Sequence, residues 1–473
     1  MAQHALAYCE ATNPTVQATA LNLAAGQLRE LAHYTTTQVL PPERALIQRI
    51  ISEWEKLVAE EQGALGARAV QGMSQAELRA AEFAPRQSTI WERPLQPFDN
   101  PYVVGDPVYP PLFVGRKDIF DQITHVWGAK ENPDSIILFG HRRMGKSSIL
   151  RNLAEYAPPG HLLAYLDMGG ETSFVESTAD LLLTLADKLY AVTRAAHPEA
   201  TLPAPDAADY EQANRAQRAF NQLGAHIATA IAPHTLILAL DEFEAIEQAV
   251  EAGKIGPEIF QFLRTKSQER WLTLVFGGLH TLDEMSRDYQ QPFFGSYSNI
   301  HVSYLGQQEA ERLITNPSPT FKLNYEREAV AEIIAQTGGQ PYLVQLVCRD
   351  ALDHLNREML DEGLDRLAKI NTADVAWATS DELFQRGAIY FDGVWRQTTS
   401  DDQRQLLRVM AQRPEPWTVG ELLPLVGLAE EPLQQALRWG ERHDVLRKVG
   451  DGDGATWGFF VPLFRRWVAT RKR

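Results

Sequence analysis

The sequence has few cysteines and no long apolar run. Cys9 and Cys348 are the only cysteines in 473 residues, too few for a disulfide framework or a cysteine-rich metal site. The most apolar stretch, residues 227–240, contains polar residues and a proline, and it is shorter than the roughly 18–20 apolar residues of a membrane span. The first residues lack the basic and then apolar pattern of a signal peptide. We therefore expect a soluble cytoplasmic protein.

Excess positive charge is also absent. The chain contains 61 acidic and 45 basic residues, a formal net charge of −16. A net acidic surface repels phosphate backbones, so nonspecific nucleic-acid binding is not expected. One basic group occurs at the C-terminal end, where it either contacts phosphates or forms a solvated tail: Arg465, Arg466, Arg471, Lys472 and Arg473.

The N-terminal part of the chain divides into a helical region and a connector. Apolar residues recur at helical spacing between residues 46 and 58, and this stripe either packs within the chain or binds a partner helix. Residues 85–111 contain seven prolines, which block helices and central strands. Because this segment also carries aromatic residues, we expect a connector that lies against a protein surface.

The remaining chain shows an α/β pattern, then helices, then a short β-hairpin. Four apolar runs alternate with helical patterns and predict a parallel sheet with crossover helices: Ile136–Phe139, Leu162–Asp167, Thr235–Leu240 and Trp271–Phe276. Near the C-terminus, helical patterns precede a glycine-rich turn (450–454) and an aromatic strand (457–460), which suggests a winged helix. The length suits two to four domains. We expect a helical N-terminal region (1–84), a connector (85–111), an α/β domain (112–304), a helical domain (305–397) and a winged helix (398–473).

One segment fits the phosphate-binding pattern G-x-x-x-x-G-K-[ST]. Its glycines let the loop curl so that backbone N–H groups point at one phosphate, and the following helix adds the positive end of its dipole. We predict that Lys146 contacts the β- and γ-phosphates and that Ser147 binds Mg²⁺. A chance match is the alternative, but an apolar strand precedes the loop and a helical pattern follows it, as the motif requires. The predicted nucleotide-binding residues are Gly140, His141, Arg142, Arg143, Met144, Gly145, Lys146, Ser147 and Ser148.

A second segment places two acids directly after a buried apolar strand. A carboxylate at such a strand end reaches the metal beside the phosphates, so Asp241 is the predicted Mg²⁺ ligand. Glu242 is suited to orient and deprotonate the attacking water, which makes it, with Lys146, a predicted catalytic residue. The alternative is a strand end with two solvated acids. Glu244 and Glu247 are interpreted as solvated charges on a helix face.

Four short segments carry a family resemblance. Together they resemble the STAND NTPases, the archaeal-type ATPases and the AAA+ initiators related to origin-recognition proteins, over residues 101–473: Phe113–Arg116, Gly140–Ser148, Asp241–Glu244 and Thr337–Tyr342. The resemblance implies an α/β P-loop NTPase of the ASCE or AAA+ type, followed by a helical lid and a winged helix. It implies ATP with Mg²⁺ as the bound nucleotide, Val114 in the adenine pocket, and Pro341 approaching the nucleotide from the lid.

The same resemblance implies a polar sensor after the strand at residues 271–276. Gly277, Gly278 or His280 takes that position, and His280 is either a sensor near the γ-phosphate or a hydrogen-bonded loop histidine. No arginine finger is evident, and Arg287 is either a finger or a surface arginine.

The P-loop arginines also remain open. Arg142 and Arg143 either contact phosphate or a neighbouring subunit, or they are solvated. An effector segment and a repeat array, common in STAND proteins, are not recognisable in the sequence.

Three functions remain open. The favoured one is a slowly hydrolysing MgATP switch that changes conformation or assembly, with self-association or a protein partner. The second is a DNA-associated AAA+ ATPase, similar to initiators or transposition regulators, that uses its winged helix. The predicted recognition helix, Glu430–His443, carries three glutamates against two arginines, which favours a protein-contacting winged helix instead. The third function is a scaffold stabilised by ATP.

Overall fold

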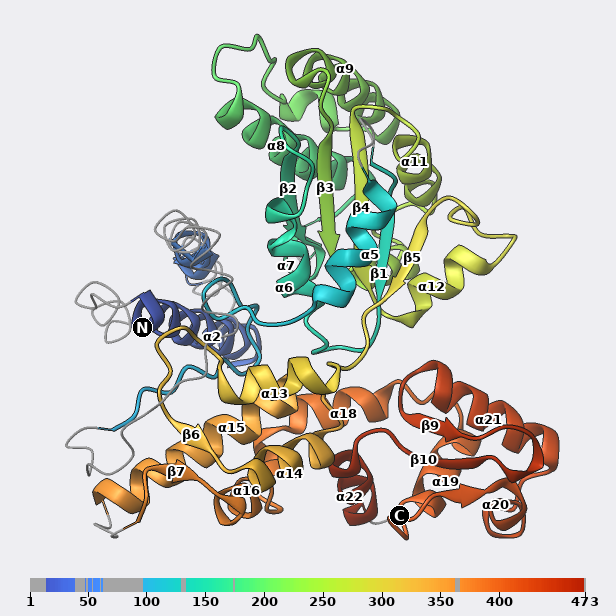
Figure 1. Cartoon of the computed structure of the whole chain (residues 1–473). Coiled ribbons are helices and arrows are strands. Elements are labelled where there is room, and N and C mark those ends of the chain that lie inside the picture. Colours follow the sequence, from blue (N-terminus) through green and yellow to red (C-terminus); the bar gives the residue numbers. More distant parts are fainter. Residues whose placement is uncertain are drawn as a thin grey trace. The chain divides into compact units, whose positions relative to one another are not determined.

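The computed structural model describes residues 14–38, 47, 50–52, 54–59, 61–62, 97–128, 133–172, 175–361 and 366–471. They form two compact units (Figure 1). The sheet unit comprises residues 116–303, and the helical unit combines residues up to 115 with residues 304–473. Among the described helices, none has both the length and the apolar character of a membrane span.

The sheet unit contains five parallel strands in the order β2-β3-β4-β1-β5. The three central strands are apolar and fully buried, as expected for a parallel sheet covered by helices on both faces. Four strands confirm the predicted apolar runs, but β5 was not predicted, because Ile300 is its only fully buried residue. The strands are β1 (Ile136–Phe139), β2 (Leu162–Asp167), β3 (Leu236–Asp241), β4 (Leu272–Gly278) and β5 (Ser298–His301).

Helices flank this sheet, and their apolar faces complete its core (Figure 1). Helix α8 starts where the Ser177 side chain accepts a hydrogen bond from the backbone N–H of Asp180. The helices are α5 (Lys117–Trp127), α6 (Lys146–Arg151), α7 (Met168–Glu171), α8 (Thr178–Ala196), α9 (Ala213–Ile231), α10 (Glu244–Glu251), α11 (Glu258–Lys266) and α12 (His280–Arg287).

The first part of the helical unit, after residue 304, is built almost entirely from helices. Two short strands pair in parallel within it. Its elements are α13 (Gln307–Thr315), β6 (Asn324–Tyr325), α14 (Arg327–Thr337), α15 (Pro341–Asn356), β7 (Lys369–Ile370), α16 (Thr372–Ala378), α17 (Leu383–Arg386) and α18 (Ala388–Arg396).

The C-terminal part has the winged-helix order of helix, strand, two helices and a hairpin, which confirms the prediction. Its antiparallel sheet has the order β8-β10-β9. One continuous hydrophobic core joins these elements to the preceding helices. The elements are α19 (Asp401–Met410), β8 (Trp417–Thr418), α20 (Val419–Val426), α21 (Glu430–Arg442), β9 (Leu446–Val449), β10 (Thr456–Phe459) and a final helix, α22 (Pro462–Thr470).

The C-terminal arginines are not a solvated tail, so that alternative is wrong for the three that are described. Arg465 donates to the carbonyl oxygen of Ala411 at 3.1 Å. Arg466 pairs with Asp381 and Arg471 pairs with Asp392, at 3.0 and 2.9 Å. Arg465 and Arg466 lie on α22 and Arg471 directly follows it, and the pairs of Arg466 and Arg471 tie the end of the winged helix to the preceding helical part. The last two basic residues of the run lie outside the described residues.

The described N-terminal residues pack within the helical unit, and of the apolar stripe at residues 46–58 only part does so: Ile51 and Val58 are buried, whereas Ile50, Trp54 and Leu57 are exposed. Helix α2 (Pro14–Gln38) buries apolar residues against later N-terminal residues and against the connector. The described part of the connector, residues 97–111, lies on a protein surface as predicted, because the Tyr102 hydroxyl donates to the carbonyl oxygen of Ile314 and Phe98 packs on the core. The buried apolar residues that α2 shares with the later N-terminal residues and the connector are Ala18, Leu21, Ala24, Leu28, Ile51, Val58, Val103, Val108 and Leu112.

Candidate nucleotide-binding site

The glycine-rich loop runs from the end of β1 to the start of α6 at Lys146. Its backbone has positive φ at Gly140, Arg143 and Gly145, with values of 153°, 65° and 89°. A Cβ atom on Gly140 would lie 2.3 Å from the carbonyl oxygen of Val302, so only glycine fits there. The loop therefore has the curled backbone that its sequence predicts.

Lys146 is held inside this loop. Its ammonium group donates hydrogen bonds to the carbonyl oxygens of Gly140 and His141, at 2.8 and 2.7 Å, and the residue is 9% exposed. Burial lowers the pKa of Lys146, and the negative charges of Glu244, Asp241 and Glu242 oppose that shift. The amine of Lys146 is therefore close enough to these three carboxylates to feel their negative charge.

Arg116 supports the loop from outside it, a role that the sequence did not suggest. The residue begins α5 with φ of 65° and is 3% exposed. Its guanidinium donates to the carbonyl oxygen of Ser303 at 2.8 Å and to that of Met144 in the middle of the loop. The sequence feature that could have pointed to this role is the position of Arg116 in the Phe-Val-Gly-Arg segment.

The two acids lie at the carboxyl end of β3. Because β4 alone separates β3 from β1, the acids and the glycine-rich loop share one edge of the sheet. Asp241 is 1% exposed, and its Oδ1 accepts a hydrogen bond from the backbone N–H of Glu242 at 3.0 Å. Its Oδ2 accepts a second one from the Tyr165 hydroxyl at 2.9 Å. The Asp241 carboxylate is thus both buried and oriented.

The side chain of Glu242 points toward α7, the short helix that follows β2. Its backbone is left-handed, with φ of 49°, and its Oε2 lies 2.5 Å from where a Cβ atom on Gly169 would be. Although Glu242 is exposed, partial desolvation of its carboxylate raises its pKa, and the charges of Asp167, Glu244 and Asp241 add to this effect. Arg142 opposes the shift. The result is a carboxyl group that holds its proton more tightly than a free glutamate does.

Glu244 is buried, so its interpretation as a solvated helix-face charge is wrong. It is 7% exposed, its Oε1 lies 3.6 Å from Nη2 of Arg142, and its Oε2 has no hydrogen-bond partner among the described residues. The reason is that α10 begins at Glu244, so its first turn packs toward the loop. Glu247 is half-buried and accepts a hydrogen bond from the Thr281 hydroxyl at 3.2 Å. Burial also raises its pKa.

A cavity of about 350 Å³ opens beside Glu242, with Arg142, Gly169, Thr172 and Glu244 among its lining residues. It lies on the side of the acids that faces the turn after β2. The carboxylate of Glu242 therefore has open space beside it.

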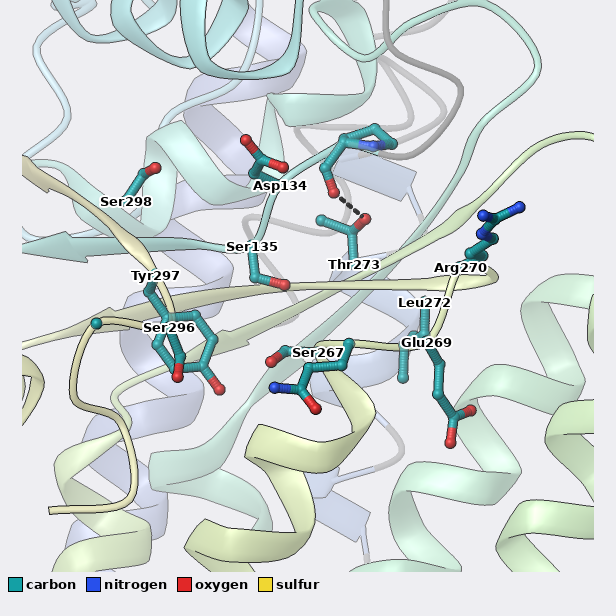
Figure 2. Close-up of a pocket in the computed structure, with 13 residues that line it drawn as sticks. Asp134, Ser135, Ser267, Glu269, Arg270, Leu272, Thr273, Ser296, Tyr297 and Ser298 are labelled. Carbon is teal, nitrogen blue, oxygen red and sulfur yellow. Dashed lines mark hydrogen bonds between the residues drawn. The ribbon is translucent and has the colours of Figure 1, made fainter.

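Another cavity, of about 340 Å³, lies at the amino ends of β1, β4 and β5 (Figure 2). Its hydroxyl groups serve the protein itself: Thr273 donates to the carbonyl oxygen of Pro133 at 2.7 Å, and Ser135 accepts from the backbone N–H of Leu274. Because the glycine-rich loop and the acids are at the opposite, carboxyl edge of the sheet, this cavity is not part of the candidate site.

The residues at the carboxyl edge fit a magnesium ion. Mg²⁺ prefers oxygen ligands and commonly takes one or two carboxylates together with phosphate oxygens. Asp241 provides a buried carboxylate, and Ser147 provides a hydroxyl in the first turn of α6. Both residues belong to the sheet unit. Asp241 ends β3, which pairs with β4, and Ser147 lies on α6, which contacts β4.

The sensor candidates lie near the loop, although their contact with a γ-phosphate stays a prediction. The His280 ring lies 5.1 Å from that of His141. Gly277 lets the sheet pack tightly, since a Cβ atom there would lie 2.9 Å from Oδ1 of Asp241. Arg287 pairs with Asp283 at 3.0 Å and its side chain is 69% exposed, which favours a surface arginine.

Two predicted nucleotide contacts belong to the helical unit. Val114 is half-buried and packs against the core of that unit. Pro341 is in the first turn of α15, after a Gly-Gly turn in which Gly338 approaches the carbonyl oxygen of Phe460: a Cβ atom would lie 2.4 Å from it. The turn thus joins the helices to the winged helix, and the nucleotide contacts of Val114 and Pro341 remain predictions.

Comparison with known proteins places this geometry in context. Residues 112–252 match the family profile described as the AAA ATPase domain. A Walker-type ATPase of Pyrococcus abyssi is similar in structure, with a TM-score of 0.53 and 14% identity, covering 79% of this chain and 99% of that chain. The comparison with curated proteins gave no match.

Two further solved structures have lower TM-scores. The Orc1 protein of Aeropyrum pernix in complex with DNA has a TM-score of 0.38 and 12% identity, over 76% of this chain and 93% of that chain. Cdc6p from Pyrobaculum aerophilum has a TM-score of 0.40 and 14% identity, over 77% and 96%. At such identities the similarity concerns the fold, and for the Pyrococcus protein it extends over nearly its whole length.

Proposed function

Because residues 112–252 form an AAA ATPase domain, we propose that this protein binds MgATP at its glycine-rich loop and hydrolyses it slowly as a regulatory switch. One observation carries the proposal. The amine of Lys146, fixed on the loop carbonyls, and the pair Asp241 and Glu242 lie at the same carboxyl edge of one sheet. Phosphoryl transfer is catalysed by positioning the phosphates and stabilising their charge, and this arrangement supports both.

Each residue of the site has a role in this proposal. Lys146 exchanges its two carbonyl partners for β- and γ-phosphate oxygens, while the loop N–H groups bind the phosphates. Ser147 and Asp241 would hold Mg²⁺, which would supply positive charge to neutralise the phosphates. Glu242 orients the attacking water and accepts its proton, and a raised pKa makes it a stronger base than an ordinary carboxylate.

The switch requires that ATP and ADP favour different arrangements of the protein. Moving a population from 1:99 to 99:1 takes about 5.5 kcal/mol of differential binding. Val114 and Pro341, both in the helical unit, are the proposed contacts through which that unit responds to the nucleotide. Because the helices after residue 304 and the winged helix share one hydrophobic core, they respond together. Self-association or a protein partner reads out the change.

The DNA-binding alternative has less support. On α21, Arg438 is paired with Glu431 at 3.1 Å, which leaves less positive charge for phosphate contacts. The arginines of α22 and Arg471, which directly follows it, are hydrogen-bonded within the helical unit. A winged helix that contacts protein therefore remains the proposal.

Equilibrium binding of a fluorescent ATP analogue to Lys146→Ala tests nucleotide binding. We expect at least a tenfold loss of affinity, whereas the exposed Lys322→Ala is the control and should bind as the parent does. Parent-like binding by Lys146→Ala contradicts the proposal.

The switch is tested by light scattering with ADP and with a non-hydrolysable ATP analogue. Identical masses and radii in the two nucleotides would count against a switch. A hydrolysis rate unchanged in Glu242→Gln would favour the ATP-stabilised scaffold.

A further inference from the structure

Tyr165 is half-buried and lies beside the predicted metal ligand Asp241. It belongs to β2, whose register places Asp167 directly opposite Asp241 on β3. Because alternate residues of a strand share a face, Tyr165 and Asp167 point to the same side of the sheet as Asp241. The Tyr165 hydroxyl spans the distance to Oδ2 of Asp241, with a hydrogen bond of 2.9 Å.

Arg151 connects this tyrosine to the helix that follows the glycine-rich loop. It is the last residue of α6, and its guanidinium lies 4.5 Å from the centroid of the Tyr165 ring, within the range of a cation–π contact. Its positive charge also stabilises the carboxylate of Asp167, which burial and the charge of Asp241 otherwise disfavour. The first turn of the same helix carries Lys146 and Ser147. One short helix thus holds phosphate-binding residues at its start and the anchor of Tyr165 at its end.

The hydrogen bonds of Asp241 leave a defined set of free positions on its carboxylate. An ionised carboxylate offers about four lone-pair positions. The backbone N–H of Glu242 uses one on Oδ1, and the Tyr165 hydroxyl uses one on Oδ2. Since one donor directly follows β3 and the other comes from β2, they fix the plane of the carboxylate and leave one position on each oxygen.

We propose that Tyr165 is a positioning residue for the metal site: its hydroxyl fixes the Asp241 carboxylate so that the remaining lone pairs face the Mg²⁺ of the bound nucleotide. Arg151 holds the tyrosine ring in place from α6. The inference rests on the proposed function, because it requires Asp241 to be a metal ligand. It adds a contact from β2 and α6 that the glycine-rich loop and the acid pair do not include.

The decisive variant is Tyr165→Phe, which removes one oxygen and keeps the ring under Arg151. Calorimetric titration of Mg²⁺ into protein saturated with ADP should give an apparent Mg²⁺ dissociation constant about 10–100-fold higher than that of the parent, the usual cost of losing a hydrogen bond to a metal ligand. ADP affinity in EDTA should be unchanged. The control is Tyr210→Phe, a tyrosine of the same unit that is 4% exposed and far along the chain from the site. Its Mg²⁺ affinity should equal that of the parent.

Two more variants separate the possible failures. Asp241→Asn should abolish Mg²⁺-dependent binding; if it does not, the proposed function itself is wrong. If Asp241→Asn loses the metal but a folded Tyr165→Phe binds Mg²⁺ within twofold of the parent, only the positioning role is overturned. Should Tyr165→Phe fail to fold in a thermal melt, Arg151→Met provides the test, since it leaves the hydroxyl in place. It should weaken Mg²⁺ binding in the same direction, and an unchanged constant overturns the inference.

Discussion

The guanidinium of Arg116 donates a hydrogen bond to the carbonyl oxygen of Met144, and so connects the start of α5 with the middle of the glycine-rich loop. A second bond from the same group, to Ser303, fixes it to the segment after β5. The loop is therefore held by a charged side chain that does not itself belong to the phosphate-binding motif. This contact orients backbone groups that the nucleotide is proposed to use.

Arg116→Ala should weaken nucleotide binding without touching the motif. Hydrogen bonds to charged groups contribute roughly 1.5–3 kcal/mol, and about 1.4 kcal/mol corresponds to a tenfold change in affinity. We therefore expect at least a tenfold increase in the dissociation constant of an ATP analogue. Arg194→Ala is the matched control, because its guanidinium also donates to a carbonyl oxygen, at an exposed position. Equal affinities for the two variants would show that Arg116 does not support the loop.

Gly140→Ala should destabilise the sheet unit and abolish nucleotide binding. The φ of 153° costs a non-glycine residue about 1–3 kcal/mol, and the added Cβ atom would lie 2.3 Å from the carbonyl oxygen of Val302. Thermal unfolding followed by circular dichroism measures the loss. Gly253→Ala is the control for backbone conformation alone, since its φ is 71° and a Cβ atom there meets nothing within 4 Å. A melting temperature for Gly140→Ala equal to that of the control would contradict the steric argument.

The pH dependence of hydrolysis should reflect the raised pKa of Glu242. A general base acts in its deprotonated form, so kcat/KM should fall as the pH drops through the pKa of the free enzyme. Because desolvation and neighbouring acids raise that pKa, the fall should begin at a higher pH than for an ordinary glutamate. Steady-state rates between pH 4 and pH 8 test this. Glu242→Gln should be slower by about 10²–10⁴-fold and lose this acid limb.

The same residue should influence the stability of the nucleotide-free protein. A carboxyl group whose pKa is higher in the folded state binds its proton more tightly there than in the unfolded chain. Its contribution to stability is therefore full at low pH and is lost as the pH rises through the folded pKa. Glu242→Gln should raise the melting temperature at pH 7, by a few degrees at most because the residue is exposed to solvent, and should have little effect at pH 4. A lower melting temperature at pH 7 would contradict the electrostatic account.

The arginines of α22 should support the fold more than they support DNA binding. Arg466 pairs with Asp381 and Arg471 pairs with Asp392, and Arg471 also lies 4.2 Å from the Trp467 ring centroid. Replacing both with alanine should cost about 1–2 kcal/mol of unfolding free energy, since surface pairs each contribute up to about 1 kcal/mol. Titration of duplex DNA at two salt concentrations should show weak binding by parent and variant alike. Strong, salt-sensitive binding by the parent that the double variant loses would favour the DNA-associated alternative.

The winged helix and the P-loop region show which helices and strands local sequence patterns can predict. The recognition-type helix was predicted as Glu430–His443 and is observed as Glu430–Arg442. The strand Ile136–Phe139 was predicted residue for residue. In contrast, β5 was missed because its polar residues form no apolar run, and α22 was read as a basic tail although Pro462 begins a helix with a buried face. Edge strands and partly buried helices depend on their neighbours, which the local sequence does not name.

The sequence by itself determined the glycine-rich loop and the two acids after a buried strand, because each is a short contiguous pattern whose chemistry depends on residue type and spacing. Tertiary structure alone decided what surrounds them. Tyr165 reaches Asp241, Arg116 reaches Met144, and Glu244 is buried beside Arg142. These pairs are formed by the strand order β2-β3-β4-β1-β5 and by the helices packed on it. Such contacts join residues far apart in the chain, and no local periodicity records which of them will meet.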